Sequence, residues 1–121
     1  MREERGTIAG DYTVTEAMTL WGSVGGNVTV AEGVKFYLRG AIYGDITCEY
    51  GGRMHIFGRV SGSLLLNGGK VIHSGVLGGD AINDGGRLFI ETTAVINGKI
   101  KTNKGETKIS KLYAGPPPTK D

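Results

Sequence analysis

Few residues in this chain of 121 have the type and spacing that chemistry at a site requires. The two histidines, His55 and His73, have no Cys or carboxylate at metal-ligand spacing, and no phosphate-binding loop or nucleophile motif is present. The acidic residues are scattered and form no clustered pair of the kind that glycoside hydrolysis needs. We therefore predict a protein that is not an enzyme and that uses no metal or cofactor.

The remaining composition restricts the class of protein. The single cysteine, Cys48, excludes an intrachain disulfide and fits a reducing compartment. A net charge of +2 gives no reason to expect nucleic acid as a partner. The first residues lack the apolar run of a signal peptide, and no stretch is apolar enough to form a transmembrane segment. These features predict a cytoplasmic protein.

The chain contains a repeat centred on glycine, and this repeat determines where any functional surface lies. The pattern G-x-[IV]-x-G-[DN]-[IV] is clearest in residues 22–28 and 40–46, and looser copies lie at 6–12, 58–64, 75–81 and 94–100. The second glycines of the copies are residues 10, 26, 44, 62, 79 and 98, so the period is 16 to 19 residues. Such a period indicates a repeat architecture in which each unit stacks on the previous one.

Within each unit the apolar residues alternate, which is the period of a β-strand. We therefore predict an all-β, single-domain, right-handed parallel β-helix (β-solenoid) of about six coils with repeats of 16–20 residues. Residues 6–109 form this domain, residues 1–5 a charged N-terminal segment, and residues 110–121 a flexible C-terminal tail.

Stacking the units places equivalent apolar residues in four columns that face the interior. Two columns come from the first strand of each coil: Met18, Phe36, Met54, Val71, Leu88; and Leu20, Leu38, Ile56, His73, Ile90. Two come from the later strands: Ile8, Val24, Ile42, Val60, Leu77, Ile96; and Tyr12, Val28, Ile46, Leu64, Ala81, Ile100. His73 interrupts an aliphatic column, and we expect it to be hydrogen-bonded rather than catalytic.

The repeated glycine pattern, which ends in the segment 88–100, resembles the bactofilins, which are bacterial polymer-forming cytoskeletal proteins. The resemblance covers about residues 6–100 and implies a right-handed β-helix that polymerises. The Pro-containing segment 114–121 is similar to a short bactofilin tail. The Gly-Gly pairs followed by Arg53, Lys70 and Arg87 are more similar to the passenger repeats of autotransporter adhesins, which are exported.

Two outward columns carry polar residues. The first lies beside the repeat glycines: Asp11, Asn27, Asp45, Ser63, Asp80 and Lys99. We interpret it as hydrogen bonding at the corners of the coils rather than as a row of calcium sites. The second consists of like charges that repel unless they are solvated, paired or bound to a polyanion: Lys35, Arg53, Lys70 and Arg87. Solvated side chains and binding to a polyanion both remain open.

A third outward set carries large apolar or aromatic side chains on the outer side of the first strand: Trp21, Tyr37, His55, Phe57, Ile72 and Phe89. A contiguous exposed patch of this kind marks an interaction surface. Either a lateral partner covers these residues, or a segment such as residues 108–113 folds back over them.

The ends of an uncapped solenoid favour head-to-tail stacking into open filaments. The residues that we expect at this contact are Ile8, Tyr12 and Val14 at one end and Ile96, Ile100 and Ile109 at the other. The sequence thus predicts a non-enzymatic scaffold that self-assembles end to end, with itself as the partner and another protein or an anionic membrane surface as further candidates. The alternative is a capped, monomeric β-solenoid that binds a specific protein or polyanion.

Overall fold

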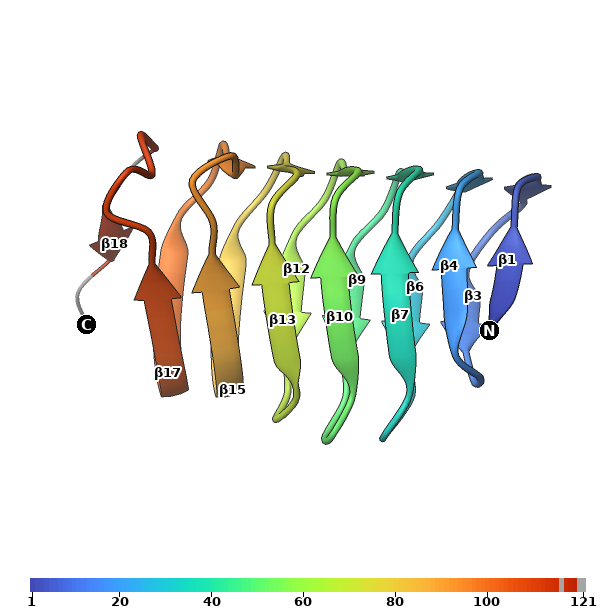
Figure 1. Ribbon diagram of the computed structural model, residues 1–121, viewed down its shortest axis with the longest axis horizontal. Coiled ribbons are helices and arrows are strands. Elements are labelled where there is room, and N and C mark those ends of the chain that lie inside the picture. Colours follow the sequence, from blue (N-terminus) through green and yellow to red (C-terminus); the bar gives the residue numbers. More distant parts are fainter. Residues whose placement is uncertain (116, 120–121) are drawn as a thin grey trace.

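The computed structural model describes residues 1–115 and 117–119 and shows an all-β chain with no helix in that part (Figure 1). Successive strands stack along one axis, with the first and the last strands of the chain at opposite ends of a rod. The chain winds as a right-handed parallel β-solenoid of about six coils, as the repeat predicted. The interior is lined from one end to the other by the apolar side chains of stacked strands.

Each coil contributes one strand to each of three walls, and every strand pair is parallel. The front wall of Figure 1 consists of β1 (Arg2–Glu4), β4 (Met18–Leu20), β7 (Lys35–Leu38), β10 (Arg53–Ile56) and β13 (Lys70–His73). The back wall consists of β3 (Tyr12–Val14), β6 (Val28–Val30), β9 (Ile46–Cys48) and β12 (Leu64–Leu66). Two long strands, β15 (Ala81–Ile90) and β17 (Ile100–Ile109), run through both walls and join them.

The third, short wall has two-residue strands that connect the front wall to the back wall in each coil. These are β2 (Thr7–Ile8), β5 (Ser23–Val24), β8 (Ala41–Ile42), β11 (Arg59–Val60), β14 (Val76–Leu77) and β16 (Val95–Ile96). Their pairing continues through Val95 and Ile96, so the longer step of 19 residues between Gly79 and Gly98 leaves the register of this wall intact.

The registers of the strand pairs confirm all four predicted inward columns. In the first, Met54 lies between Phe36 and Val71, and in the second, Ile56 lies between Leu38 and His73. Val60 and Leu64 hold the equivalent places in the third and fourth columns. The columns form one continuous core because the alternating side chains of every coil point at the same axis.

A fifth inward column lies on the back wall and becomes polar towards the C-terminal end. Val14, Val30, Cys48 and Leu66 are followed by Asn83, which is fully buried. The Asn83 amide donates to the Gly86 and Glu106 carbonyls and to the Thr107 hydroxyl, and its oxygen accepts from the Gly85 and Gly86 amides. This network holds the corner between the two walls in the coil formed by β15, where the pairing with β17 shifts register.

Glycine is required at two kinds of place in each coil. Gly51 and Gly68 turn the chain at the back corner with φ values of 72° and 99°, a region that side chains disfavour. Gly44 has an ordinary φ, but a Cβ there would collide with the Asn27 side chain and the Gly26 backbone of the preceding coil. The glycines that repeat in the sequence therefore mark the positions where a coil turns and where its backbone contacts the preceding coil.

The corner column forms a ladder of hydrogen bonds, as its sequence predicted. The Asp11 side chain accepts from the Asn27 amide at 2.8 Å, the Asn27 side chain from the Asp45 amide, and the Asp45 side chain from the Ser63 amide. Ser63 and Asp80 continue the ladder to Lys99. Each rung joins one coil to the next, and no group of acidic residues that could hold a metal occurs in the described part of the chain.

The sheets extend beyond the predicted domain at both ends. Residues 2–4 of the charged N-terminal segment form β1 and pair with β4. In the predicted tail, Pro118–Thr119 forms β18, which pairs with Ile100 and Lys101 of β17. Residues 116, 120 and 121 of that tail lie outside the described residues.

Candidate functional site

Nucleophilic and titratable groups of the interior are held in unreactive states. The Cys48 thiol is fully buried in the fifth inward column, and this burial raises its pKa to about 11. A thiol with a raised pKa is a poor nucleophile at neutral pH. The Cys48 thiol is therefore held in its neutral, weakly nucleophilic form.

His73 is fully buried, and the expected hydrogen bond is at most a weak contact with the Val95 backbone. Neither ring nitrogen makes a hydrogen bond of ordinary geometry among the residues that the structure describes. The reason is its column, in which the neighbours on either side are Ile56 and Ile90. Burial lowers the pKa of His73 to about 4, so the ring is neutral at physiological pH.

The predicted basic column is present as a continuous row on the front wall. Lys35, Arg53, Lys70 and Arg87 are direct register partners in four successive coils, and all are exposed. Adjacent members are therefore separated by the spacing of paired strands, about 4.8 Å at the backbone. None of the four forms an ion pair within the described parts of the chain.

The predicted aromatic surface consists of two columns rather than one. Tyr37, His55, Ile72 and Phe89 are register partners on the outer side of β7, β10, β13 and β15. Trp21 and Phe57 instead come directly after β4 and β10, where their backbone amides bond to the preceding coil. They therefore line the corner beside the front wall, at a position two residues further along each coil than the column of Tyr37 and His55.

Arg39 completes the Trp21 and Phe57 column, and the sequence interpretation missed it. Its guanidinium carbon lies 4.0 Å from the Phe57 ring centroid and 5.4 Å from that of Trp21. Arg5 lies 5.0 Å from the Trp21 ring, so cations and aromatic rings alternate along this edge. The constant 18-residue spacing of Trp21, Arg39 and Phe57 was the signal that would have found it.

A shallow groove runs between the basic column and the neighbouring aromatic column. Its cavity has a volume of about 180 Å³ and is lined by Lys35, Tyr37, Arg53, Met54, His55, Lys70 and Ile72. His55 stacks on Phe57 with ring centroids 3.6 Å apart and shares a hydrogen bond of 3.0 Å with the Ser74 hydroxyl. Partial burial lowers the pKa of His55.

Residues 108–113 do not fold back over this front wall. Lys108 lies at the end of β17 as the register partner of Phe89, and the chain then turns across the C-terminal end of the rod to β18 (Figure 1). Trp21 and Phe57 remain 42% and 37% exposed. The front wall is thus open to solvent along its length.

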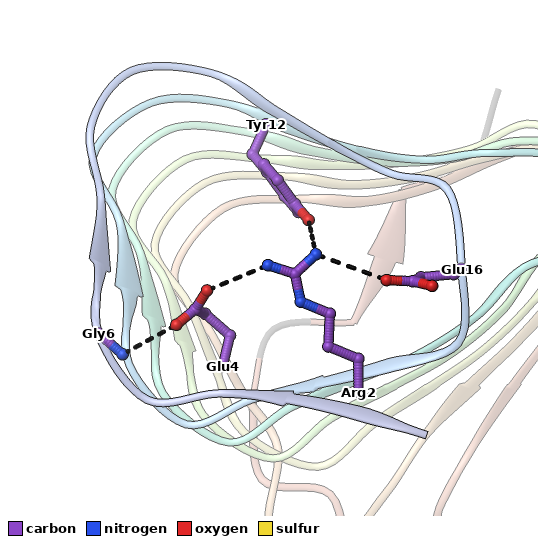
Figure 2. Close-up of polar contacts among 5 residues, drawn as sticks. All are labelled: Arg2, Glu4, Gly6, Tyr12 and Glu16. Atoms are coloured by element: carbon purple, nitrogen blue, oxygen red, sulfur yellow. Dashed lines mark hydrogen bonds and ion pairs between the residues drawn. The ribbon is translucent and has the colours of Figure 1, made fainter.

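The N-terminal end of the rod is polar. Figure 2 shows the Arg2 guanidinium inside the ring of the first coil, where it donates to the Tyr12 hydroxyl at 3.3 Å and to the Glu16 carboxylate at 3.5 Å. It also pairs with Glu4 at 3.4 Å, and the second Glu4 oxygen accepts from the Gly6 amide. Arg2 occupies the same inward column as Met18, so a charged network replaces the apolar core at this end.

The C-terminal end is polar as well and carries the opposite charge. Thr102 and Thr107 face the interior of the last coil and share a hydrogen bond of 2.7 Å. Residues 99–111 contain five lysines and one glutamate, a net charge of +4, whereas residues 1–16 contain two arginines and four acidic residues, a net charge of −2.

The apolar residues predicted at the ends are largely covered. Val14, Ile96 and Ile100 are buried within the core, and Ile8, Tyr12 and Ile109 are partly buried against it. Ile100 is covered because β18 pairs beside it. Polar groups, rather than the predicted aliphatic side chains, form the outer surface of both ends.

A comparison with protein-family models, curated proteins and solved structures finds no match to this chain. In the described part of the chain, no helix has the length and apolar character needed to span a membrane. The geometry of the walls and ends therefore carries the functional argument.

Proposed function

We propose that this protein is a non-enzymatic structural scaffold that self-assembles end to end into filaments in the cytoplasm. The resemblance of its glycine repeat to that of the bactofilins supports this proposal. The observation that carries it is the match between the two ends of the rod in strand direction, polarity and charge.

Both ends expose strand edges that another copy can extend. The short wall ends in β2 and β16, and the outer edges of β1 and β3 have no neighbouring strand among the described residues. Unpaired edges of parallel strands are templates for further pairing. A second copy that continues the same register would form a head-to-tail contact, which generates an open filament.

Continuing the columns across that contact brings opposite charges together. The column of Phe89 ends in Lys108, and the same column begins with Glu3, the register partner of Thr19. The corner ladder ends in Lys99 and begins with Asp11. Lys108 of one copy would thus face Glu3 of the next, and Lys99 would face Asp11 once β18 has left the edge of β17.

A charge exchange tests this contact. We expect wild-type protein to form rods that grow with concentration, and Lys108→Glu to reduce them to monomers because it places two acids together. The double variant Glu3→Lys with Lys108→Glu should restore assembly. Arg59→Glu, which changes an exposed residue of β11 away from both ends, is the matched control.

Sedimentation velocity across a concentration series and negative-stain microscopy measure the outcome. Assembly by Lys108→Glu as strong as that of the wild type would contradict the proposed register. A wild-type mass that stays near 12.8 kDa at all concentrations would contradict assembly itself.

The second candidate is a capped monomeric binding module. The position of β18 favours it, because this strand occupies the edge of β17 beside Ile100 and Lys101 that an incoming β3 would need. Removing residues 114–121 separates the two candidates. A scaffold should assemble at lower concentration without β18, whereas a binding module should remain monomeric.

A further inference from the structure

We propose that the groove on the front wall binds a linear chain of inorganic phosphates, with Lys35, Arg53 and Lys70 of the groove and Arg87 beyond its end as ligands. This inference is independent of end-to-end assembly, since the groove lies on the side of the rod. End-to-end assembly does not require the proposed polyphosphate ligand.

The middle of the front wall carries an unbalanced positive charge, between the acidic residues of β1 and Glu106 of β17, the register partner of Arg87. The strands β4, β7, β10 and β13 contain three of the four basic-column residues and no Asp or Glu. The fourth, Arg87, follows in register on β15. Like charges stacked at about 4.8 Å raise the local positive potential, which an anionic chain lying along the column would relieve.

Neighbouring side chains orient one of the cations and form the other side of the groove. The Lys70 ammonium lies 5.5 Å from the Phe89 ring centroid, so it is directed along the wall. The groove between Lys35, Arg53 and Lys70 on one side and Tyr37, His55 and Ile72 on the other follows the rod axis. A groove of this shape accepts an extended chain better than a flat membrane surface.

Phosphate is the anion that suits this set of donors. Arginine binds phosphate oxygens with two parallel hydrogen bonds, and lysine adds a compact point charge. Consecutive phosphates of a polyphosphate share a bridging oxygen, so their charges recur more closely than the strands. Each cation of the column therefore has a phosphate within reach in any alignment of the chain.

The rings at the corner beside the groove are already engaged by other side chains, which argues against single-stranded nucleic acid as the occupant. Proteins that bind it without sequence preference stack successive bases on open aromatic faces. Here Arg5 and Arg39 cover the faces of Trp21, and Arg39 and His55 contact the ring of Phe57. A ligand that carries phosphates without bases needs none of these faces.

The test measures binding of sodium polyphosphate by isothermal titration calorimetry, with oligothymidylate and phosphatidylglycerol vesicles as competing probes. We expect polyphosphate to bind more tightly than either probe, with an affinity that falls as salt rises. Reversing the central charge in Arg53→Glu should weaken binding about tenfold, whereas the matched variant Arg59→Glu should change it by no more than about twofold.

Arg53 and Arg59 are both exposed, so circular dichroism should show both variants folded. Repeating the titration with Lys108→Glu separates binding from assembly, because this variant keeps the basic column. Absence of polyphosphate binding would overturn the proposal, as would tighter binding of oligothymidylate or vesicles. Equal effects of Arg53→Glu and Arg59→Glu would also overturn it.

Discussion

The middle coils and the end coils of this rod have the same strand register, but their inward-facing side chains differ in polarity. One inward column begins with Arg2, continues through Phe36 and Met54, and ends with Thr107. The aliphatic and aromatic members lie between two other coils, whereas Arg2 and Thr107 each have a coil on one side only. A position in a repeat therefore tolerates charge when water reaches it from the open side.

This difference has a functional consequence. Polar terminal repeats keep a solenoid soluble, because an apolar end would aggregate without regard to register. Here the polar ends also differ in net charge, −2 for residues 1–16 and +4 for residues 99–111. The arrangement favours contact between unlike ends and disfavours contact between like ends.

The largest expected effect on stability comes from removing a large side chain from the middle of the core. Phe36 is fully buried between Met18 and Met54, so Phe36→Ala should lower the free energy of unfolding by about 3–5 kcal/mol. Thr107→Ala, in the same column at the end of the rod, should cost no more than about 1 kcal/mol. Urea denaturation monitored by circular dichroism measures both, and equal losses would contradict the distinction between middle and end.

The next effect is a pH dependence that originates in the middle of the rod. Burial lowers the pKa of His73 from 6.5 to about 4, so between these values the unfolded chain binds more protons than the folded one. The contribution of neutral His73 to stability is fully present above pH 6.5 and is lost as the pH falls towards 4. The loss amounts to about 3 kcal/mol, from 1.36 kcal/mol for each unit of pKa.

Replacing the ring by an aliphatic side chain tests this origin. His73→Leu should be more stable than wild type at pH 5 and should lose most of the decline between pH 6.5 and 4, because Leu matches its neighbours Ile56 and Ile90. His55→Gln, on the solvent side of the same wall, should retain the decline. Thermal unfolding at a series of pH values measures this, and an unchanged decline in His73→Leu would assign it to other groups.

The sequence predicted those parts of the fold in which the two-residue alternation of apolar side chains and the period of the glycines apply together. Alternation identifies which side chains face inward, and the glycine period aligns one coil with the next, as Val24, Ile42 and Val60 illustrate. Neither period applies to Arg2, Glu3 and Glu4, where no apolar residue marks the inward side. The polar N-terminal network was therefore not predictable, although the strand that carries it continues the sheet.

The outward surface was predicted less well for a related reason. Trp21 and Tyr37 were assigned to one surface because both are aromatic and both lie near a first strand. Their placement depends on where each strand ends and the chain turns, and alternation does not report this. The cation–aromatic contacts of Arg39 follow from that turn.

The smallest expected effect distinguishes the rungs of the corner ladder. The Asp45 side chain accepts a hydrogen bond of 2.8 Å from the Ser63 amide in the next coil, so Asp45→Ala should lower the free energy of unfolding by about 1 kcal/mol. Lys99 donates its amide to Asp80 but is the last residue of the ladder, and Lys99→Ala keeps that backbone donor. In the monomer it should therefore leave stability within about 0.5 kcal/mol of wild type.

Urea denaturation of both variants in the Lys108→Glu background, where we expect no assembly, compares a rung between two coils with one at the end. A loss in Lys99→Ala as large as that in Asp45→Ala would show that the ladder stabilises each coil by itself rather than by joining it to the next.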